Sequence, residues 1–303
     1  MKTDRWPALP LGAGHGTRAT LHMWSQVVGK LAIPTMPLVN HYWSHTLHFT
    51  SRGLSTLPMS ADGRTLTAAF DFVSHELILS ASDGAIERIK LEPRTVAEFH
   101  VAVMKALGRM GIAIRVWTMP VEVAKPIHFE LDTTHRSYDP EWAHAFWRAL
   151  DSMRPVFEEF RSRFIGKCSP VHFFWGGFDL ALTRFSGRRA PERPGADRVT
   201  RESYSHEVVS HGFWPSGAMP DGRKIDECVF YAYAVPEPAG FSTATAKPAG
   251  AFYSAEFNEF LLPYEAVRSA ASPEQALMSF LESTYDAGAR LGNWNRSELE
   301  RLP

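Results

Sequence analysis

The sequence of 303 residues has little cysteine and no excess of charge. It holds two cysteines, Cys168 and Cys228, which is typical of a protein kept in the reducing cytoplasm. Lys and Arg number 32 against 33 Asp and Glu, so no general attraction to nucleic acid or to an anionic membrane is expected. The chain also lacks a run of about 18 apolar residues and the apolar stretch of a signal peptide. We therefore expect a soluble cytoplasmic protein with no nucleic-acid or membrane partner.

Motifs of the common catalytic and metal sites are also missing. The segment 204–215 resembles a zinc-protease helix, but His206 and His211 are five residues apart, not four, and would not share a helical face. His41, His45 and His48 have no acidic or cysteine ligand at useful spacing. The sequence therefore assigns no metal ligand and leaves the cofactor unknown.

What is present is the composition of a folded domain, with 45% hydrophobic and 12% aromatic residues. Helical periodicity predicts about four helices, and alternating apolar residues predict a larger number of strands. The helices are expected at 18–32, 95–110, 139–166 and 272–292. The strands are expected at 40–50, 65–73, 76–80, 85–91, 112–117, 171–175, 178–185, 204–214, 229–235, 251–253 and 259–262. Because these elements cluster and do not alternate strictly, the fold class is α+β with mainly antiparallel sheet.

Polar residues recur every four positions on the first predicted helix, where Arg18, His22, Gln26 and Lys30 form a stripe. The third predicted helix contains Pro155, which should kink or split it. A Pro-rich polar region at 120–139 is the best boundary, dividing a single unit of residues 1–303 into halves at 1–125 and 126–303. Two similar halves remain an open alternative, supported only by short repeated tripeptides.

The most informative segment is 166–180. Gly176 and Gly177 between two aromatic-rich strands predict a tight hairpin with positive φ at the turn. In that register one side is wholly apolar, and the other side carries His172 and Asp179 as diagonal neighbours. The pair could act in acid–base catalysis or could be a buried hydrogen bond that only satisfies two polar groups.

Other polar and aromatic residues lie near this hairpin in the sequence. His206 or Glu207 would complete a catalytic group with His172 and Asp179. Arg184 and Arg188 have the geometry to hold an anionic group, and the indoles of Trp175 and Trp214 would form walls. Three long polar connections, at 186–202, 215–227 and 236–250, leave the same strands, as loops around a site often do.

Several segments resemble a known bacterial family. They are 6–11 and 37–41 near the N-terminus and, with higher specificity, GKCSPVHFFW (166–175), TRFSGR (183–188), SHEV (205–208) and GFWP (212–215). The family is catalogued only as a domain of unknown function. The resemblance covers nearly the whole chain, so it implies one family-wide unit, and it implies no activity, cofactor or catalytic residue. In one departure, the family has fewer glycines where this chain has Gly12, Gly14 and Gly16.

Three functions remain open on these observations. The leading hypothesis is a small-molecule-binding protein or enzyme whose polar cleft beside the hairpin takes a small anionic ligand. The second is a non-catalytic interaction protein whose aromatic residues partly form a partner surface. The third is a metal-dependent enzyme. The reaction, the substrate and the oligomeric state do not follow from the sequence.

Overall fold

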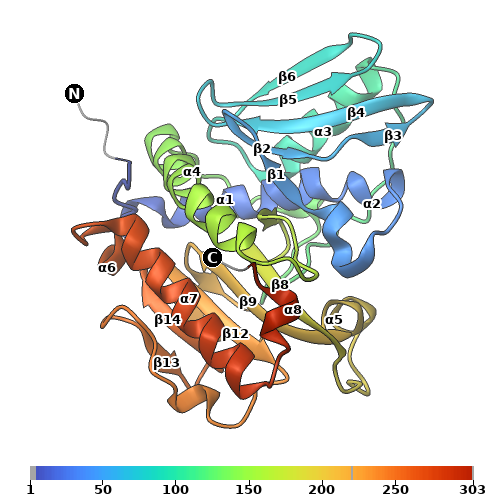
Figure 1. Ribbon diagram of the computed structural model, residues 1–303. Coiled ribbons are helices and arrows are strands. Elements are labelled where there is room, and N and C mark those ends of the chain that lie inside the picture. The colour runs from blue at the N-terminus through green and yellow to red at the C-terminus, as the bar shows by residue number, and fades with distance from the viewer. Residues whose placement is uncertain (1–4, 220, 302–303) are drawn as a thin grey trace.

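The computed structural model describes residues 5–219 and 221–301 (Figure 1). Within them one large antiparallel sheet has 12 strands in the order β13-β14-β12-β9-β8-β7-β1-β2-β4-β5-β6, with β3 paired to β4. Helices cover this sheet, so the α+β class with mainly antiparallel sheet is confirmed. Residue 220, within the predicted connection 215–227, and residues 1–4 and 302–303 lie outside the described residues.

The N-terminal half of the chain forms one end of the sheet. Its elements are α1 (Leu11–Gly29), α2 (Ala32–Thr35), the 3-10 helix η1 (Asn40–His45), β1 (Leu47–Phe49), β2 (Gly53–Thr56), β3 (Met59–Ala61), β4 (Arg64–Asp71), β5 (Glu76–Ala81), β6 (Ile86–Lys90), α3 (Val96–Arg109) and η2 (Phe129–Leu131). The order is a helix, an antiparallel meander and a second helix.

The C-terminal half repeats that order. Its elements are α4 (Pro140–Ser162), β7 (His172–Phe174), β8 (Asp179–Arg189), α5 (Arg198–Ser203), β9 (His206–Trp214), β10 (Gly217–Ala218), β11 (Lys224–Ile225), β12 (Val229–Val235), η3 (Phe241–Thr243), β13 (Phe252–Ser254), β14 (Glu259–Pro263), α6 (Tyr264–Arg268), α7 (Pro273–Leu291) and α8 (Arg296–Leu299). The two halves meet where β1 pairs with β7, at Leu47 and Phe173.

The four long helices form one layer on one face of the sheet. α1 packs against α3 and α4, and α4 packs against α7, which lies across β9 and β12 in Figure 1. Side chains that alternate along each strand meet these helices, as Phe173 of β7 meets Phe146 of α4 at 6.3 Å between ring centroids. The other sheet face, here called the open face, carries the remaining side chains of each strand. None of the helices in the described part of the chain is long and apolar enough to span a bilayer.

Helix starts agree with the sequence signals. Thr95 and Glu98 form the predicted capping box of α3, and Asp139 caps α4 with Pro140 in its first turn. Ser272 caps α7 in the same way. In each case a side-chain oxygen accepts a backbone N–H that the first helical turn leaves free, which is why these starts are visible locally.

Three predicted elements are wrong. Residues 40–45 form η1 instead of a strand, because His41 and Tyr42 adopt left-handed φ values of 56° and 60°. Residues 112–117 form no regular element. Pro155 lies inside the continuous helix α4, so of the two predicted effects, a kink or a split, the split is wrong. The predicted strand 40–50 is correct only at Leu47–Phe49, which form β1 and pair with β2 and β7, whereas 112–117 have apolar alternation without a strand partner.

Candidate functional site

The polar stripe of α1 is buried. The exposed fractions of its members are 7% for Arg18, 7% for His22, 0% for Gln26 and 2% for Lys30. Burying four polar side chains on one helix is costly unless each finds a partner. Each of the four bonds to the backbone of a segment far away in the sequence.

His22 and Gln26 hold two loops together. The carbonyl of Gly176 can only accept, so His22 Nε2 donates to it, at 2.6 Å. The Gln26 amide donates to the carbonyl of Val121 and accepts from its N–H, both at 2.8 Å. Burial lowers the pKa of His22 to about 3, so the ring stays neutral. His22 and Gln26 therefore hold the loop that contains Val121, here called the 121 loop, beside the turn between β7 and β8.

Arg18 and Lys30 act at the two ends of the stripe. Arg18 Nη1 donates to the carbonyl of Ser216 at 3.2 Å, and Lys30 Nζ donates to the carbonyl of Met119 at 2.7 Å. Burial lowers the pKa of Lys30 to about 8. The stripe thus bonds to the backbone of three segments, which contain Met119 and Val121, Gly176 of the β7–β8 turn, and Ser216.

The β7–β8 hairpin has the predicted register, with Phe174 opposite Asp179. Its turn differs from the prediction, because the residue with positive φ is Phe178, at 59°, and neither glycine adopts one. The glycines are needed for space instead. A Cβ on Gly176 would lie 2.5 Å from Glu122 Oε1, and one on Gly177 would lie 2.7 Å from Asp179 Oδ1. The carboxyl groups of Glu122 and Asp179 therefore both lie against this turn.

A tyrosine from a strand two positions away reaches Asp179. Tyr231 of β12 crosses Gly212 of β9 and donates its phenol proton to Asp179 Oδ2 at 2.5 Å. A Cβ on Gly212 would lie 2.3 Å from the Tyr231 hydroxyl, so only glycine leaves room for this bond. The residue opposite Gly212 on β8 is Ala181, which also leaves the path open.

Three carboxyl groups influence one another here. Burial, and then the charge of Glu122, raises the pKa of Asp179 to about 7, although the bond from Tyr231 opposes this. Burial and the charge of Asp179 raise the pKa of Glu259 to about 8, against the opposing effect of Arg223. Burial and then the charge of Asp197 raise the pKa of Glu122. Asp179 and Glu259 are partly exposed, and Glu122 is exposed as a residue although its carboxyl group packs against Gly176, so solvent reaches the group.

Aromatic residues surround these carboxyl groups. Tyr231 and Tyr233 stack at 5.9 Å on the open face, and the hydroxyl of Tyr204 lies 3.2 Å from that of Tyr233. Trp214 is partly buried and donates its indole N–H to the carbonyl of Gly177 at 3.0 Å. We define Glu122, Asp179, Glu259, Tyr231 and Trp214 as the carboxyl–tyrosine cluster.

The structure places the predicted pair, His172 and Asp179, on the same face, with no hydrogen bond between them among the described residues. His172 is fully buried, and its Nδ1 lies 3.1 Å from the hydroxyl of Thr46. Its ring packs on Phe174 at 4.5 Å. Burial lowers the pKa of His172 to about 3, so this histidine is neutral at physiological pH.

The other predicted residues separate into different surroundings. Glu207 pairs with Arg188 at 2.6 Å, and Arg188 also donates to the carbonyl of Gly292 at the end of α7. His206 lies on the open face near His41, 6.1 Å between ring centroids. These contacts put Glu207 and Arg188 away from Asp179.

The two remaining predicted residues lie under the helices. The Arg184 guanidinium stacks on the Phe160 ring at 3.5 Å and on Tyr285 at 4.3 Å, and it donates to the Phe160 carbonyl. Trp175 is buried against Gly29 of α1, where a Cβ would lie 2.3 Å from the indole. Of the predicted residues, only Asp179 and Trp214 belong to the carboxyl–tyrosine cluster.

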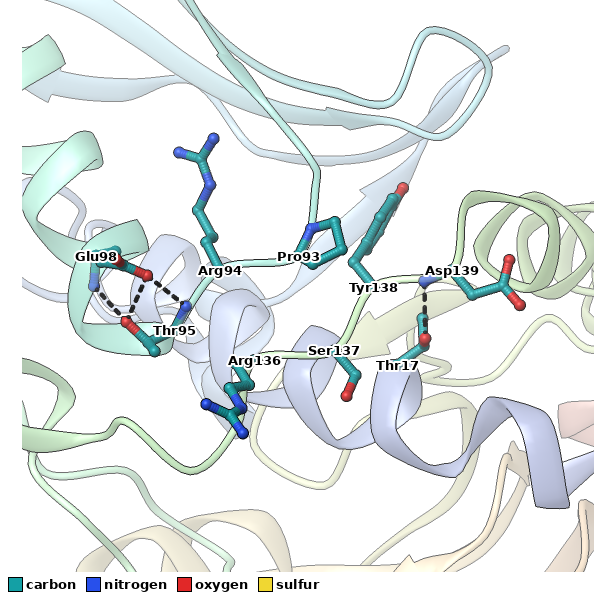
Figure 2. Close-up of a pocket in the computed structure, with 9 residues that line it drawn as sticks. All are labelled: Thr17, Pro93, Arg94, Thr95, Glu98, Arg136, Ser137, Tyr138 and Asp139. Atoms are coloured by element: carbon teal, nitrogen blue, oxygen red, sulfur yellow. Dashed lines mark hydrogen bonds between the residues drawn. The ribbon is translucent and has the colours of Figure 1, made fainter.

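A groove lies elsewhere, between the starts of α3 and α4 (Figure 2). Its volume is about 610 Å³, and its lining includes Arg94, Glu98, Arg136 and Asp139. The Glu98 and Asp139 carboxylates already cap the two helix starts, so these starts have no free donors for an anion. We therefore place the candidate site at the carboxyl–tyrosine cluster.

Metal and thiol chemistry find little support in the described part of the chain. No group of three or more His, Cys, Asp and Glu residues there has a geometry that could hold a metal ion. Burial raises the pKa of Cys168 to about 11 and of Cys228 to about 12. Neither thiol is thus activated as a nucleophile.

Sequence reasoning missed Glu122, Tyr231 and Glu259. One usable signal was Gly212, since a glycine inside a strand marks a close approach of another group. A second signal was the polar stripe of α1, which is too regular for a helix facing a core. Neither signal identifies which residue packs against Gly212 or which segment bonds to the stripe.

Comparison with known proteins places the chain in a family without assigning it an activity. No curated protein and no solved structure matches it. A family model matches residues 6–301, which confirms the resemblance seen in the sequence. The chain is a member of the family of unknown function DUF5996.

Proposed function

We propose that this protein binds a small organic cation, such as a protonated amine, at the carboxyl–tyrosine cluster. The observation that carries the proposal is that Asp179 lies near two other carboxyl groups, that of Glu122 at the β7–β8 turn and that of Glu259 on β14. Among the described residues, none of the three forms an ion pair.

Electrostatics favours a cation at this place. Asp179 and Glu259 have raised pKa values because each is buried and, in addition, would carry its charge beside another carboxyl group. A positive ligand reverses that effect and favours both carboxylates. Trp214 and Tyr231 offer aromatic faces that attract a cation by their quadrupoles.

An anionic ligand, which the arginines favour in the sequence, fits this site less well. Arg184 is stacked under the helices, and Arg188 is paired with Glu207. Neither arginine contacts the cluster, and the carboxyl groups would repel an anion. We therefore keep the hypothesis of a small-molecule site near the hairpin, but we assign its ligand a positive charge instead of a negative one.

The test is a thermal-shift titration near pH 8 with putrescine, choline and benzylamine, each paired with its neutral alcohol analogue. A ligand that binds only the folded state raises the melting temperature as its concentration rises. We expect at least one amine to raise it, and its neutral analogue to have no effect.

Two variants make the test specific. Asp179→Asn should abolish the shift, whereas Asp151→Asn, at an exposed position on α4, should preserve it. The proposal is wrong if no amine exceeds its neutral analogue, or if Asp179→Asn responds as the unmodified protein does.

A second candidate function is acid–base catalysis at the same cluster. The observation that favours it is the pKa of Asp179, about 7, because proton transfer is most efficient when the catalytic pKa lies near the working pH. The test is mass spectrometry of any amine found to bind, before and after incubation. Turnover that Asp179→Asn abolishes supports catalysis, and an unchanged ligand supports binding alone.

A further inference from the structure

A lysine and a histidine meet at the other end of the open face. Lys167 lies between α4 and β7, and its carbonyl accepts the N–H of Phe185 at 3.0 Å. Its Nζ lies 2.6 Å from Nε2 of His41 in η1. The site is distinct from the carboxyl–tyrosine cluster and shares no residue with it.

The surroundings of the Lys167 amine are aromatic. Its Nζ lies 4.7 Å from the centre of the Phe185 ring and 5.7 Å from that of Trp43. No carboxylate in the described part of the chain forms an ion pair with Lys167. Burial lowers its pKa, against the opposing charge of Glu202. The side chain is partly exposed, so a small molecule can reach it.

The imidazole of His41 is held in place beside this amine. His41 and Tyr42 both adopt left-handed φ values, 56° and 60°, which cost free energy in residues other than glycine. The backbone N–H of His41 donates to Glu202 Oε1 at 3.3 Å. Burial, and then the charge of Lys167, lowers the pKa of His41 to about 4. The ring is therefore neutral, and its Nε2 accepts a hydrogen bond from Nζ of Lys167.

We propose that Lys167 is an amine nucleophile that forms a Schiff base with a small aldehyde or ketone. A nucleophile within hydrogen-bond reach of a base is the arrangement that such chemistry requires. The Lys167 ammonium releases its proton to solvent, and His41 Nε2 orients the neutral amine by accepting a hydrogen bond from it. The Nζ lone pair attacks the carbonyl carbon to give a carbinolamine. The carbinolamine hydroxyl then takes up a proton from solvent and leaves as water, the nitrogen loses its remaining proton to solvent, and a C=N bond forms. The exchange needs no oxidant or reductant.

Lys30 provides a matched comparison inside the same chain. It is buried, and its Nζ also lies near aromatic rings, 5.1 Å from the centre of Trp117. Lys30, however, is only 2% exposed and donates to the carbonyl of Met119, so a small molecule cannot reach its amine as it can reach that of Lys167. We therefore assign Lys30 a structural role and Lys167 a reactive one.

The experiment is reductive trapping of the full chain with 4-carboxybenzaldehyde and sodium cyanoborohydride, followed by peptide mass spectrometry. The probe's ring suits Phe185 and Trp43, and its carboxylate suits the positive charge of Arg189 near His206. We expect Lys167 to be modified at least tenfold faster than Lys30 and than Lys224, whose side chain is 66% exposed. Equal or slower modification of Lys167 would overturn the proposal.

Variants separate the role of His41 from simple exposure of the lysine. His41→Asn should slow trapping at Lys167 at least tenfold, and asparagine tolerates the left-handed φ at this position. His206→Asn removes a neighbouring ring that does not hydrogen-bond to Nζ and should change the rate less than twofold. An unchanged rate in His41→Asn contradicts the assigned role of His41. If that variant does not fold, the rates of the three lysines in the unmodified protein still decide the proposal.

Asp179→Asn should leave trapping at Lys167 unchanged, so the two proposals fail or succeed separately. If Asp179→Asn loses trapping at Lys167 while keeping its circular dichroism spectrum, the two sites are coupled, which contradicts their independence.

Discussion

The two halves of the sheet share an order of elements and differ in chemistry on the open face. Each half runs from a long helix through an antiparallel meander to a second long helix, α1 to α3 and α4 to α7. In the N-terminal half the open face of β4 carries Thr65, Thr67 and Ala69, opposite Ser80 and Ile78 of β5. In the C-terminal half the same face carries Asp179, Tyr231 and Glu259.

The difference lies in what surrounds the strands. The carboxylates of the N-terminal open face are paired with arginines, buried Asp71 with Arg52 and Glu76 with Arg88 across the strands at 2.8 Å. The C-terminal open face is approached by the 121 loop, which α1 holds in place. Among the described residues, the carboxylates of one open face are thus paired with arginines, whereas those of the other open face form no ion pair, and desolvation without such a partner raises a carboxyl pKa.

The largest effect is expected from Gly212→Ala. The added Cβ would lie 2.2 Å from the Leu180 carbonyl oxygen and 2.3 Å from the Tyr231 hydroxyl, so β9 or Tyr231 must move. We expect a loss of about 3 kcal/mol in the free energy of unfolding, measured by urea denaturation. Thr67→Ala, on the open face of the other half, should change it by less than about 0.5 kcal/mol. A tolerated Gly212→Ala would show that Tyr231 does not need this path to Asp179.

Asp179→Asn should stabilise the protein at high pH. The pKa of Asp179 is raised to about 7 in the folded state, so the folded protein holds this proton more tightly than the unfolded chain does. Stability is therefore lost as the pH rises from the unfolded value toward and through 7, and the asparagine variant avoids that loss. We expect a gain of about 2 kcal/mol near pH 9 that vanishes near pH 4. A gain independent of pH would contradict the raised pKa.

Tyr231→Phe should have a smaller effect with a distinct pH signature. The phenol bond stabilises ionised Asp179 and opposes the rise in its pKa, so its removal should move the titration of Asp179 above about 7. We expect a loss of about 1 kcal/mol at high pH. Carboxyl-carbon NMR on labelled protein would follow the titration directly. Tyr253→Phe, whose hydroxyl bonds to Glu237, is the control and should leave the titration of Asp179 unchanged.

The smallest effect is expected from Glu76→Gln in the N-terminal half. The ion pair with Arg88 is on the surface, with Arg88 53% exposed, and such pairs contribute about 0 to 1 kcal/mol. Thermal denaturation at low and high salt should show little difference between this variant and the unmodified protein. A loss as large as that of Gly212→Ala would remove the contrast between the two open faces.

Local signals predicted most of the regular structure. The cap residues Thr95, Asp139 and Ser272 mark the starts of α3, α4 and α7, because capping depends on residues within one turn. The strand β12 occupies the predicted range 229–235. Residues 40–45 were mistaken for a strand because two left-handed residues that are not glycine leave no local signal.

The candidate site was predicted only in part. The register of the hairpin, which puts Phe174 opposite Asp179 and His172 opposite Ala181, followed from the turn. The partners did not follow, since Asp179 bonds to Tyr231 and His172 lies against Thr46. Register is set by neighbours in sequence, whereas these partners come from strands and loops far away along the chain.

The sequence by itself determined the α+β class, the helix starts and which strand residues share a face, because periodicity and capping act over a few residues. It also established the scarcity of cysteine and the balance of charge. Only the tertiary structure decided that the polar stripe of α1 is buried and that Glu122, Asp179 and Glu259 meet. Hydrogen bonds between distant segments and the desolvation of charge depend on the packed chain as a whole, and no local pattern encodes them.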